Sequence, residues 1–169
     1  MDVSSWPGLA LRPFSAEDLP LLYEIYASTR EEELRPTGWP PEQIATFLRQ
    51  QFDAQHRWYQ THYQGGSFDL ILENGQPVGR LYVFRQARDL NLIDIALLPA
   101  HRGRGLGTFL LGQLLAEADH AGQSVSLHVE FFNRVRSLYD RLGFRQIGED
   151  GVYLEMRRDP ATAEKGQSA

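Results

Sequence analysis

The stretch Leu97-Leu98-Pro99-Ala100-His101-Arg102-Gly103-Arg104-Gly105-Leu106-Gly107-Thr108-Phe109-Leu110-Leu111 predicts an apolar strand, a basic glycine-rich turn and the start of a helix. The glycines let the backbone approach a ligand closely, because no Cβ stands in the way. Their amides would lie at a helix N-terminus, where unpaired N–H groups and the helix dipole favour an anion. Arg102 and Arg104 add positive charge, and an arginine can bind a phosphate through two donors at once. The turn therefore predicts a site for a pyrophosphate.

The composition excludes several classes of protein. A length of 169 residues predicts one domain over residues 1–169, with its core over about residues 9–157 and a frayed polar tail over residues 159–169. A formal net charge of -5 argues against a nucleic-acid partner. The absence of cysteine excludes disulfides, zinc–thiolate sites and cysteine nucleophiles, and we expect no metal. No run approaches the roughly 20 apolar residues of a membrane span, so we expect no membrane partner and a cytoplasmic location.

Apolar periodicity indicates alternating strands and helices. The expected elements are a strand over residues 9–14, helices beginning at Ser15 and at Pro41, strands over 68–72, 78–84 and 91–98, a helix over 105–121, a strand over 125–129, a helix over 133–142 and two short final strands. Asn74-Gly75 is a strong hairpin signal, so the strands around it are antiparallel. The nearly continuous apolar run over 91–98 is typical of a central strand covered on both faces. The strand–turn–helix–strand passage that follows is a parallel unit, so the sheet is mixed.

Three interpretations of the glycine-rich turn compete. A nucleotide P-loop ends in Gly-Lys-Ser/Thr, whereas this turn ends in Gly105-Leu106-Gly107-Thr108 and has no lysine. A dinucleotide-binding turn spaces its glycines differently, and the acidic residue after the next strand, Glu130, is only loosely placed for that role. A purely structural turn explains the glycines but not two arginines at the same helix start.

Two motifs in this chain resemble those of the GNAT superfamily, the Gcn5-related N-acetyltransferases. Arg102-Gly103-Arg104-Gly105-Leu106-Gly107 resembles the Gln/Arg-x-x-Gly-x-Gly/Ala motif of that family. Asn133 through Leu138-Tyr139-Asp140-Arg141-Leu142-Gly143-Phe144 resembles its downstream Asn…Leu-Tyr-x-x-x-Gly-Phe segment. The motifs stand in the right order, and the order of elements over about residues 9–157 is also similar to the family.

The resemblance implies an α/β (α+β) fold with a mixed, largely antiparallel central sheet of about six to seven strands and helices on both faces. It implies acetyl transfer from acetyl-CoA to a primary amine of a small molecule or peptide, by direct attack in a ternary complex, and relatives are often homodimers. Asn133 would hydrogen-bond the pantetheine arm, and Tyr139 would lie near the thioester sulfur. The arm would pair with backbone groups of Ala96, Leu97 and Leu98, and the pyrophosphate with backbone amides of Arg102, Gly103, Arg104, Gly105, Leu106, Gly107 and Thr108.

The chemistry of acetyl transfer needs an acid for the leaving thiolate and a base for the ammonium. By analogy with the family Tyr139 is the general acid; the alternative is that it packs in the apolar stripe of Leu138 and Leu142. Arg136 stands where relatives often carry alanine, and it either reaches a CoA phosphate or is solvated.

Three residues are candidates for the base. Many relatives place a glutamate early on the central strand, where this chain has Asp94, and burial of that carboxyl would raise its pKa. The alternative is that Asp94 is a buried hydrogen-bonding group that fixes a loop. His128 and Glu130 alternate with the apolar residues of their strand and are secondary candidates.

The acceptor site is the least defined part of the sequence. In the family it is built from the first two helices, their loop and late strands; here the first of these segments carry Tyr23, Tyr26, Arg30, Glu31, Glu32, Glu33, Trp39, Trp58 and Tyr59. The three adjacent glutamates either attract a cationic amine or form a solvated helix end. Two other functions stay open: a noncatalytic acyl-CoA-binding module, and a transferase that uses another donor such as succinyl-CoA.

Overall fold

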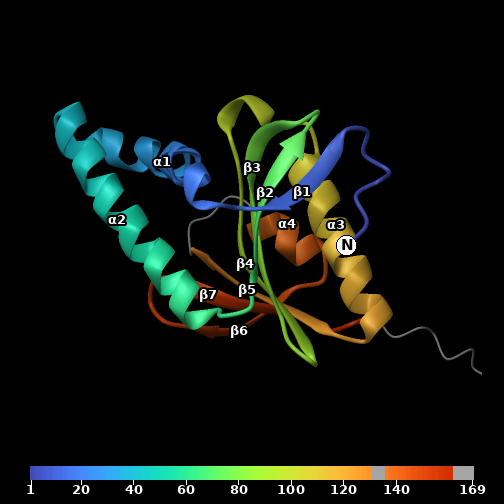
Figure 1. Cartoon of the computed structure of the whole chain (residues 1–169). Coiled ribbons are helices and arrows are strands. Elements are labelled where there is room, and N and C mark those ends of the chain that lie inside the picture. The colour runs from blue at the N-terminus through green and yellow to red at the C-terminus, as the bar shows by residue number, and fades with distance from the viewer. Residues whose placement is uncertain (131–135, 162–169) are drawn as a thin grey trace, which may run out of the picture. The chain divides into compact units, whose positions relative to one another are not determined.

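The seven strands of this chain form one mixed sheet. The computed structural model describes residues 1–130 and 136–161, and within them the strand order is β1-β2-β3-β4-β5-β7-β6 (Figure 1). The strands are β1 Leu9–Pro13, β2 Ser67–Glu73, β3 Gln76–Arg85, β4 Asp89–Leu97, β5 Ser124–Glu130, β6 Arg145–Glu149 and β7 Tyr153–Arg158. The β1–β2, β5–β7 and β6–β7 pairs are antiparallel, whereas β4 and β5 are parallel. This confirms the expected mixed, largely antiparallel sheet and the parallel unit around the glycine-rich turn.

Four α-helices accompany the sheet in the described residues. They are α1 Leu19–Leu34, α2 Pro41–His62, α3 Leu106–Ala121 and α4 Arg136–Arg141, with short 3-10 turns η1 Ala16–Asp18, η2 Arg35–Thr37 and η3 Pro99–His101. The expected start at Ser15 is present, since the Ser15 amide donates to Asp18 Oδ2 at 2.7 Å. It opens a 3-10 turn, however, and the α-helix itself begins at Leu19. None of the described helices is both long enough and apolar enough to cross a bilayer.

The β2–β3 hairpin has the turn that its sequence predicts. Asn74 and Gly75 join the two strands, and both have positive φ, at 52° and 78°. These angles are the left-handed conformation that a two-residue hairpin turn requires and that Asn-Gly supplies at low cost. Glu73 is therefore held at the end of β2, opposite Leu9 of β1.

Contacts divide the described residues into two compact units. The turn unit comprises residues 3–82 and 94–107, and the C-terminal unit comprises residues 1–2, 83–93 and 108–161. In the turn unit, α1 contacts α2, and the buried ring of Phe52 lies 5.8 Å from that of Tyr26. The buried residues of the C-terminal unit include Leu90, Leu110, Leu114, Val125, Leu127, Leu154 and Met156. Whether both units fold together as the one domain expected from the length stays a prediction.

The burial of strand β4 differs between its two halves. Its ladder with β5 pairs Asp89–Leu92 with Ser124–Leu127 and ends there. Leu90 and Leu92 are buried, whereas Ile93–Leu97 are only half-buried. The expectation of a strand covered on both faces thus agrees with the buried Leu90 and Leu92, whereas Ile93–Leu97 are less buried than it predicts.

Candidate functional site

The glycine-rich turn joins η3 to α3 and is open to a ligand. Gly103 and Gly105 have φ angles of 78° and 85°, in the left-handed region that favours glycine. A Cβ at either position would have no neighbour within 4 Å among the described residues. These glycines are therefore needed for the backbone conformation, and the space above them is available to a bound group.

The amides of this turn differ in their partners within the protein. The Arg102 amide donates to Pro99 O at 3.3 Å. Among the described residues, no carbonyl accepts from the amides of residues 103–107. Thr108 is exposed in the first turn of α3. Residues 103–107 are thus candidates for an anion site at the N-terminus of α3.

The side chain of Arg102 ties the turn to two other elements. Its Nε donates to Leu97 O at 2.9 Å, at the end of β4. Its Nη2 lies 3.4 Å from both the carbonyl and the hydroxyl oxygen of Ser28 in α1. Arg102 thus fixes the start of the turn, while its remaining donor edge is exposed.

Arg104 is held by an acidic residue. Its Nη2 lies 2.7 Å from Glu73 Oε1 and 3.1 Å from His101 Nδ1. Glu73 Oε2 accepts a further hydrogen bond from Trp6 Nε1 at 2.9 Å. The hydrogen bond from Arg104, followed by that from Trp6, lowers the pKa of Glu73 below its ordinary value.

The end of β4 lies against β3. The Leu98 amide donates to Val78 O at 2.8 Å, and a Cβ on Gly79 would clash with Ala96 O. The carbonyl of Ala96 thus lies against β3, and the carbonyl of Leu97 accepts from Arg102.

Asp94 is half-exposed on β4 and is part of an ion pair. Its Oδ2 accepts from Arg80 Nε at 2.6 Å, and its side chain is 27% exposed. Arg80 also donates to Gln55 Oε1 of α2 at 3.0 Å, and its guanidinium lies 4.8 Å from the Tyr82 ring centroid. Burial lowers the pKa of Arg80, but the interactions with Asp94, Tyr82 and Tyr59 together raise it, so the pKa lies above its ordinary value overall. Asp94 is therefore not the deeply buried carboxyl that the apolar run predicts.

Tyr139, His128 and Glu130 all belong to the C-terminal unit. Tyr139 is buried in α4, and its ring lies 5.6 Å from that of Phe144 at 67°. His128 is exposed between the buried Leu127 and Val129 of β5, and Glu130, the residue after Val129, is half-buried, which confirms their expected alternation. Register places His128 opposite Glu155 and Glu130 opposite Tyr153 of β7.

Two further donor-site candidates are Arg136 and Asn133. Arg136 is the first residue of α4 and is half-buried. Asn133 lies outside the described residues.

The acceptor candidates lie on α1, α2 and the segment between them. Glu31, Glu32 and Glu33 are exposed at the end of α1. Arg30 bonds Glu33 through Nε at 3.0 Å and Tyr26 Oη through Nη1 at 3.1 Å. The negative charge of these three glutamates is thus partly balanced by Arg30 of the same helix.

Aromatic residues of α2 stack on one another. Trp58 is 48% exposed and stacks on His62, with ring centroids 4.0 Å apart. Tyr59 lies edge-on to the buried Tyr82, at 6.0 Å. The guanidinium carbon of Arg49 lies over the ring of Tyr23, 3.8 Å from the ring centroid.

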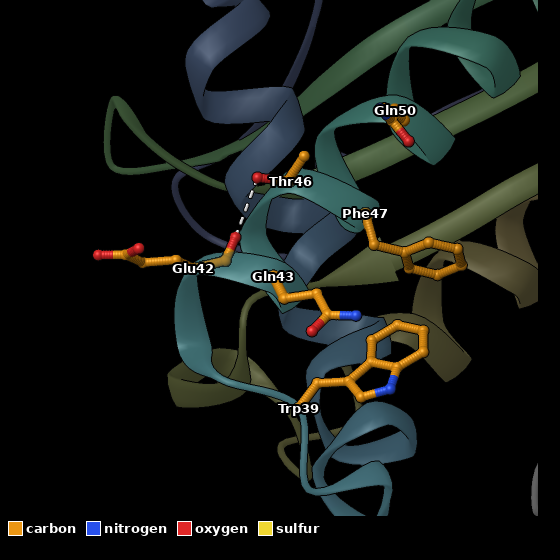
Figure 2. A pocket seen from close by; sticks show the side chains of 6 residues that line it. All are labelled: Trp39, Glu42, Gln43, Thr46, Phe47 and Gln50. Atoms are coloured by element: carbon orange, nitrogen blue, oxygen red, sulfur yellow. Dashed lines mark hydrogen bonds between the residues drawn. The ribbon is translucent and has the colours of Figure 1, made fainter.

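A shallow hollow of about 430 Å³ lies at the start of α2. It is lined by Trp39, Glu42, Gln43, Thr46, Phe47 and Gln50. Figure 2 shows the indole of Trp39 beside the ring of Phe47, with ring centroids 5.5 Å apart. Trp39 is the acceptor-site candidate among these lining residues.

Two partners in this site were missed by sequence reasoning. Arg80 had a signal, because a charged residue interrupts the apolar run Val78–Phe84. Glu73 had none, since any residue before an Asn-Gly turn can be acidic, and its partner Arg104 is far away in the chain.

Comparison with known proteins agrees with this geometry. The family model described as acetyltransferase (GNAT) family matches residues 20–144. The ribosomal protein bS18-alanine N-acetyltransferase of Haemophilus influenzae is 33% identical over 78 residues, 46% of this chain and 53% of that protein. The match thus spans about half the length of that curated relative.

Solved structures share the fold. The PaiA N-acetyltransferase of Thermoplasma acidophilum, in complex with coenzyme A, matches with a TM-score of 0.67 and 20% identity over 89% of this chain and 98% of that one. A structure described as histone acetyltransferase HPA2 and related acetyltransferase, from Corynebacterium glutamicum, matches with a TM-score of 0.63 and 23% identity over 93% and 99%. The family model covers most of the chain, and the chain therefore belongs to the acetyltransferase (GNAT) family.

Proposed function

We propose that this protein is an N-acetyltransferase that moves the acetyl group of acetyl-CoA to a primary amine of a small molecule or peptide. The attack is direct, within a ternary complex. The observation that carries the proposal is the glycine-rich turn: the amides of residues 103–107 have no carbonyl partner in the described part of the chain, and nothing stands over Gly103 and Gly105. That combination suits the pyrophosphate of coenzyme A.

The pantetheine arm has a matching edge on β4. The backbone of Ala96, Leu97 and Leu98 would pair with its amides, as an extended strand end can pair with an extended ligand. Leu97 O already accepts from Arg102, which orients the edge that receives the arm. Asn133 and Arg136 are proposed as further contacts of the arm and of a phosphate.

Acetyl-CoA supplies an activated acyl group, and side chains of the protein handle the protons. The acceptor ammonium must lose a proton to become a nucleophile, and the candidates that take it are Asp94, His128 and Glu130. Tyr139 donates its hydroxyl proton to the thiolate that leaves as the C–S bond breaks. Substitution of each candidate base identifies the true one, because its loss removes the acidic limb of the pH profile of kcat/KM.

The acceptor is proposed to be an amine on a peptide or small molecule. The Haemophilus relative is named for an alanine of a ribosomal protein, which makes a peptide beginning with alanine the first acceptor to test. Exposed aromatic and acidic residues on α1 and α2 offer a surface that suits a cationic chain.

The test has two stages. Thermal unfolding is followed with acetyl-CoA, coenzyme A and NADH, since a ligand that binds the folded state raises its apparent stability. Release of free thiol from acetyl-CoA is then measured over a panel of amines that includes the alanine peptide. A shift with acetyl-CoA but not NADH, together with thiol release for one amine, supports the proposal.

Three other outcomes contradict it. A shift with acetyl-CoA and no thiol release with any amine favours the noncatalytic binding module. Thiol release with succinyl-CoA but not acetyl-CoA favours a different donor. No shift with acetyl-CoA at saturation would overturn the interpretation of the turn itself.

A further inference from the structure

We propose that Glu73 limits how tightly the glycine-rich turn binds the phosphates of its ligand, because its carboxylate competes with them for Arg104. The inference rests on the proposed donor site. It assigns a function to a residue at the end of β2, outside the two motifs of the family.

The contacts and exposure of Arg104 support this inference. Arg104 is 45% exposed beside the open amides, so an anion on the turn can reach its guanidinium. One donor nitrogen, Nη2, makes both contacts described above, at 2.7 Å to Glu73 Oε1 and 3.1 Å to His101 Nδ1. The Nη2 side of the Arg104 guanidinium therefore faces the Glu73 carboxylate.

Hydrogen bonds hold Glu73 in place and oppose its movement away from Arg104. Its side chain is 14% exposed, and Trp6 Nε1 holds its second oxygen at 2.9 Å. The backbone is fixed as well, because the Asn74 amide donates to Gly8 O at 2.8 Å. A Cβ on Gly8 would collide with the Asn74 side chain, so this packing of the N-terminal segment on the hairpin is close.

The charge of Glu73 opposes the binding of an anion. The carboxylate is ionised at neutral pH, since Arg104 and Trp6 both bond its charged form. It withdraws a donor from the ligand and also repels phosphate charge through a partly solvated path. The amide analogue keeps one oxygen, which can accept from Trp6, and places an NH2 group in place of the oxygen that Arg104 contacts, so it removes both the charge and the acceptor for Arg104. The Glu73→Gln variant should therefore bind coenzyme A about threefold to tenfold more tightly.

The experiment is a double-mutant cycle on coenzyme A affinity. Dissociation constants are measured by calorimetry for the wild type, Glu73→Gln, Arg104→Met and the double variant. We expect tighter binding for Glu73→Gln, and we expect most of that gain to vanish when Arg104 is also replaced. The gain should shrink in high salt, because salt screens charges at an exposed site.

Two control variants separate charge from structure. Glu117→Gln removes another ion-paired carboxylate, one that bonds Arg85 in a different place, and should leave the affinity unchanged. Trp6→Phe removes one hydrogen bond that holds Glu73 but keeps its charge, so any gain in affinity should be smaller than that of Glu73→Gln.

The outcomes distinguish this inference from the proposed function. If the wild type binds coenzyme A and Glu73→Gln binds it equally or less tightly, the competition is wrong while the donor site stands. A gain that survives the loss of Arg104, or that Trp6→Phe reproduces, also overturns it. If the folded wild type does not bind coenzyme A, the proposed function and this inference fail together.

Discussion

The guanidinium of Arg80 and the carboxylate of Asp94 form an ion pair between β3 and β4, with Nε and Oδ2 2.6 Å apart. The two partners are buried to different degrees: the Arg80 side chain is 4% exposed and that of Asp94 is 27% exposed. Gln55 of α2 accepts from the same guanidinium. The pair thus links α2 to both strands and orients a carboxylate near the part of β4 proposed to hold the pantetheine arm.

This asymmetry predicts unequal costs for the two single substitutions. Asp94→Asn leaves a buried guanidinium without its counter-charge and should destabilise the fold by about 3 kcal/mol. Arg80→Met leaves a carboxylate that water can reach and should cost less, about 1–2 kcal/mol. Urea unfolding of both variants and of the double variant measures these costs. Equal losses, or a larger loss for Arg80→Met, would contradict the assignment.

If Tyr139 is the general acid, removal of its hydroxyl should lower activity and leave stability nearly unchanged. Its buried ring packs edge-on against Phe144, and phenylalanine preserves that ring, so Tyr139→Phe should unfold within a few degrees of the wild type. The loss of a general acid should lower kcat by about 100-fold. Thiol release and thermal unfolding measured on the same sample check both statements. Full activity in the folded variant would leave Tyr139 with a packing role alone.

The glycine at position 105 can be compared with a matched control. Gly105 and Gly151 have φ of 85° and 89°, and a Cβ at either meets nothing within 4 Å among the described residues. Alanine at either position should therefore cost a similar amount of stability, about 1 kcal/mol. Gly105→Ala should in addition weaken coenzyme A binding at least tenfold, because its methyl group occupies space that the ligand needs. A similar loss of affinity in Gly151→Ala would show that strain, and not approach of the ligand, is responsible.

The ion pair of Asp119 and Arg158 predicts a pH dependence of stability. The guanidinium bonds both carboxylate oxygens, at 2.8 and 3.0 Å, and this lowers the pKa of Asp119. A carboxyl with a depressed folded-state pKa stabilises the protein above its unfolded-state pKa of about 3.9 and loses that effect as the pH falls through the folded-state value.

The test compares Asp119→Asn with the wild type in urea. The variant should be less stable by about 1 kcal/mol from pH 5 to 7, and the difference should shrink below about pH 4. A difference that persists unchanged at pH 2 would mean that packing, and not charge, accounts for it.

Much of the fold could be predicted from local signals. Asn74-Gly75 specified its hairpin because few other residues adopt positive φ at both positions. The apolar run that became β4 specified a central strand, and the glycines around Arg104 specified a turn before a helix. Ser15 marked a helix start correctly, but the 3-10 turn that precedes α1 depends on where Arg12 holds Asp18, at 2.9 Å.

The sequence by itself determined the open turn, its charge and the family, because these depend on residues that are neighbours in the chain. Only the tertiary structure decided which groups oppose those charges. Glu73 meets Arg104, and Arg80 meets Asp94, across strands whose pairing no local pattern encodes. The end of the β4–β5 ladder at Leu92 is likewise a result of strand register. Residues far apart in the sequence become electrostatic partners only when folding brings them close together, and strand register is likewise fixed only in the folded chain.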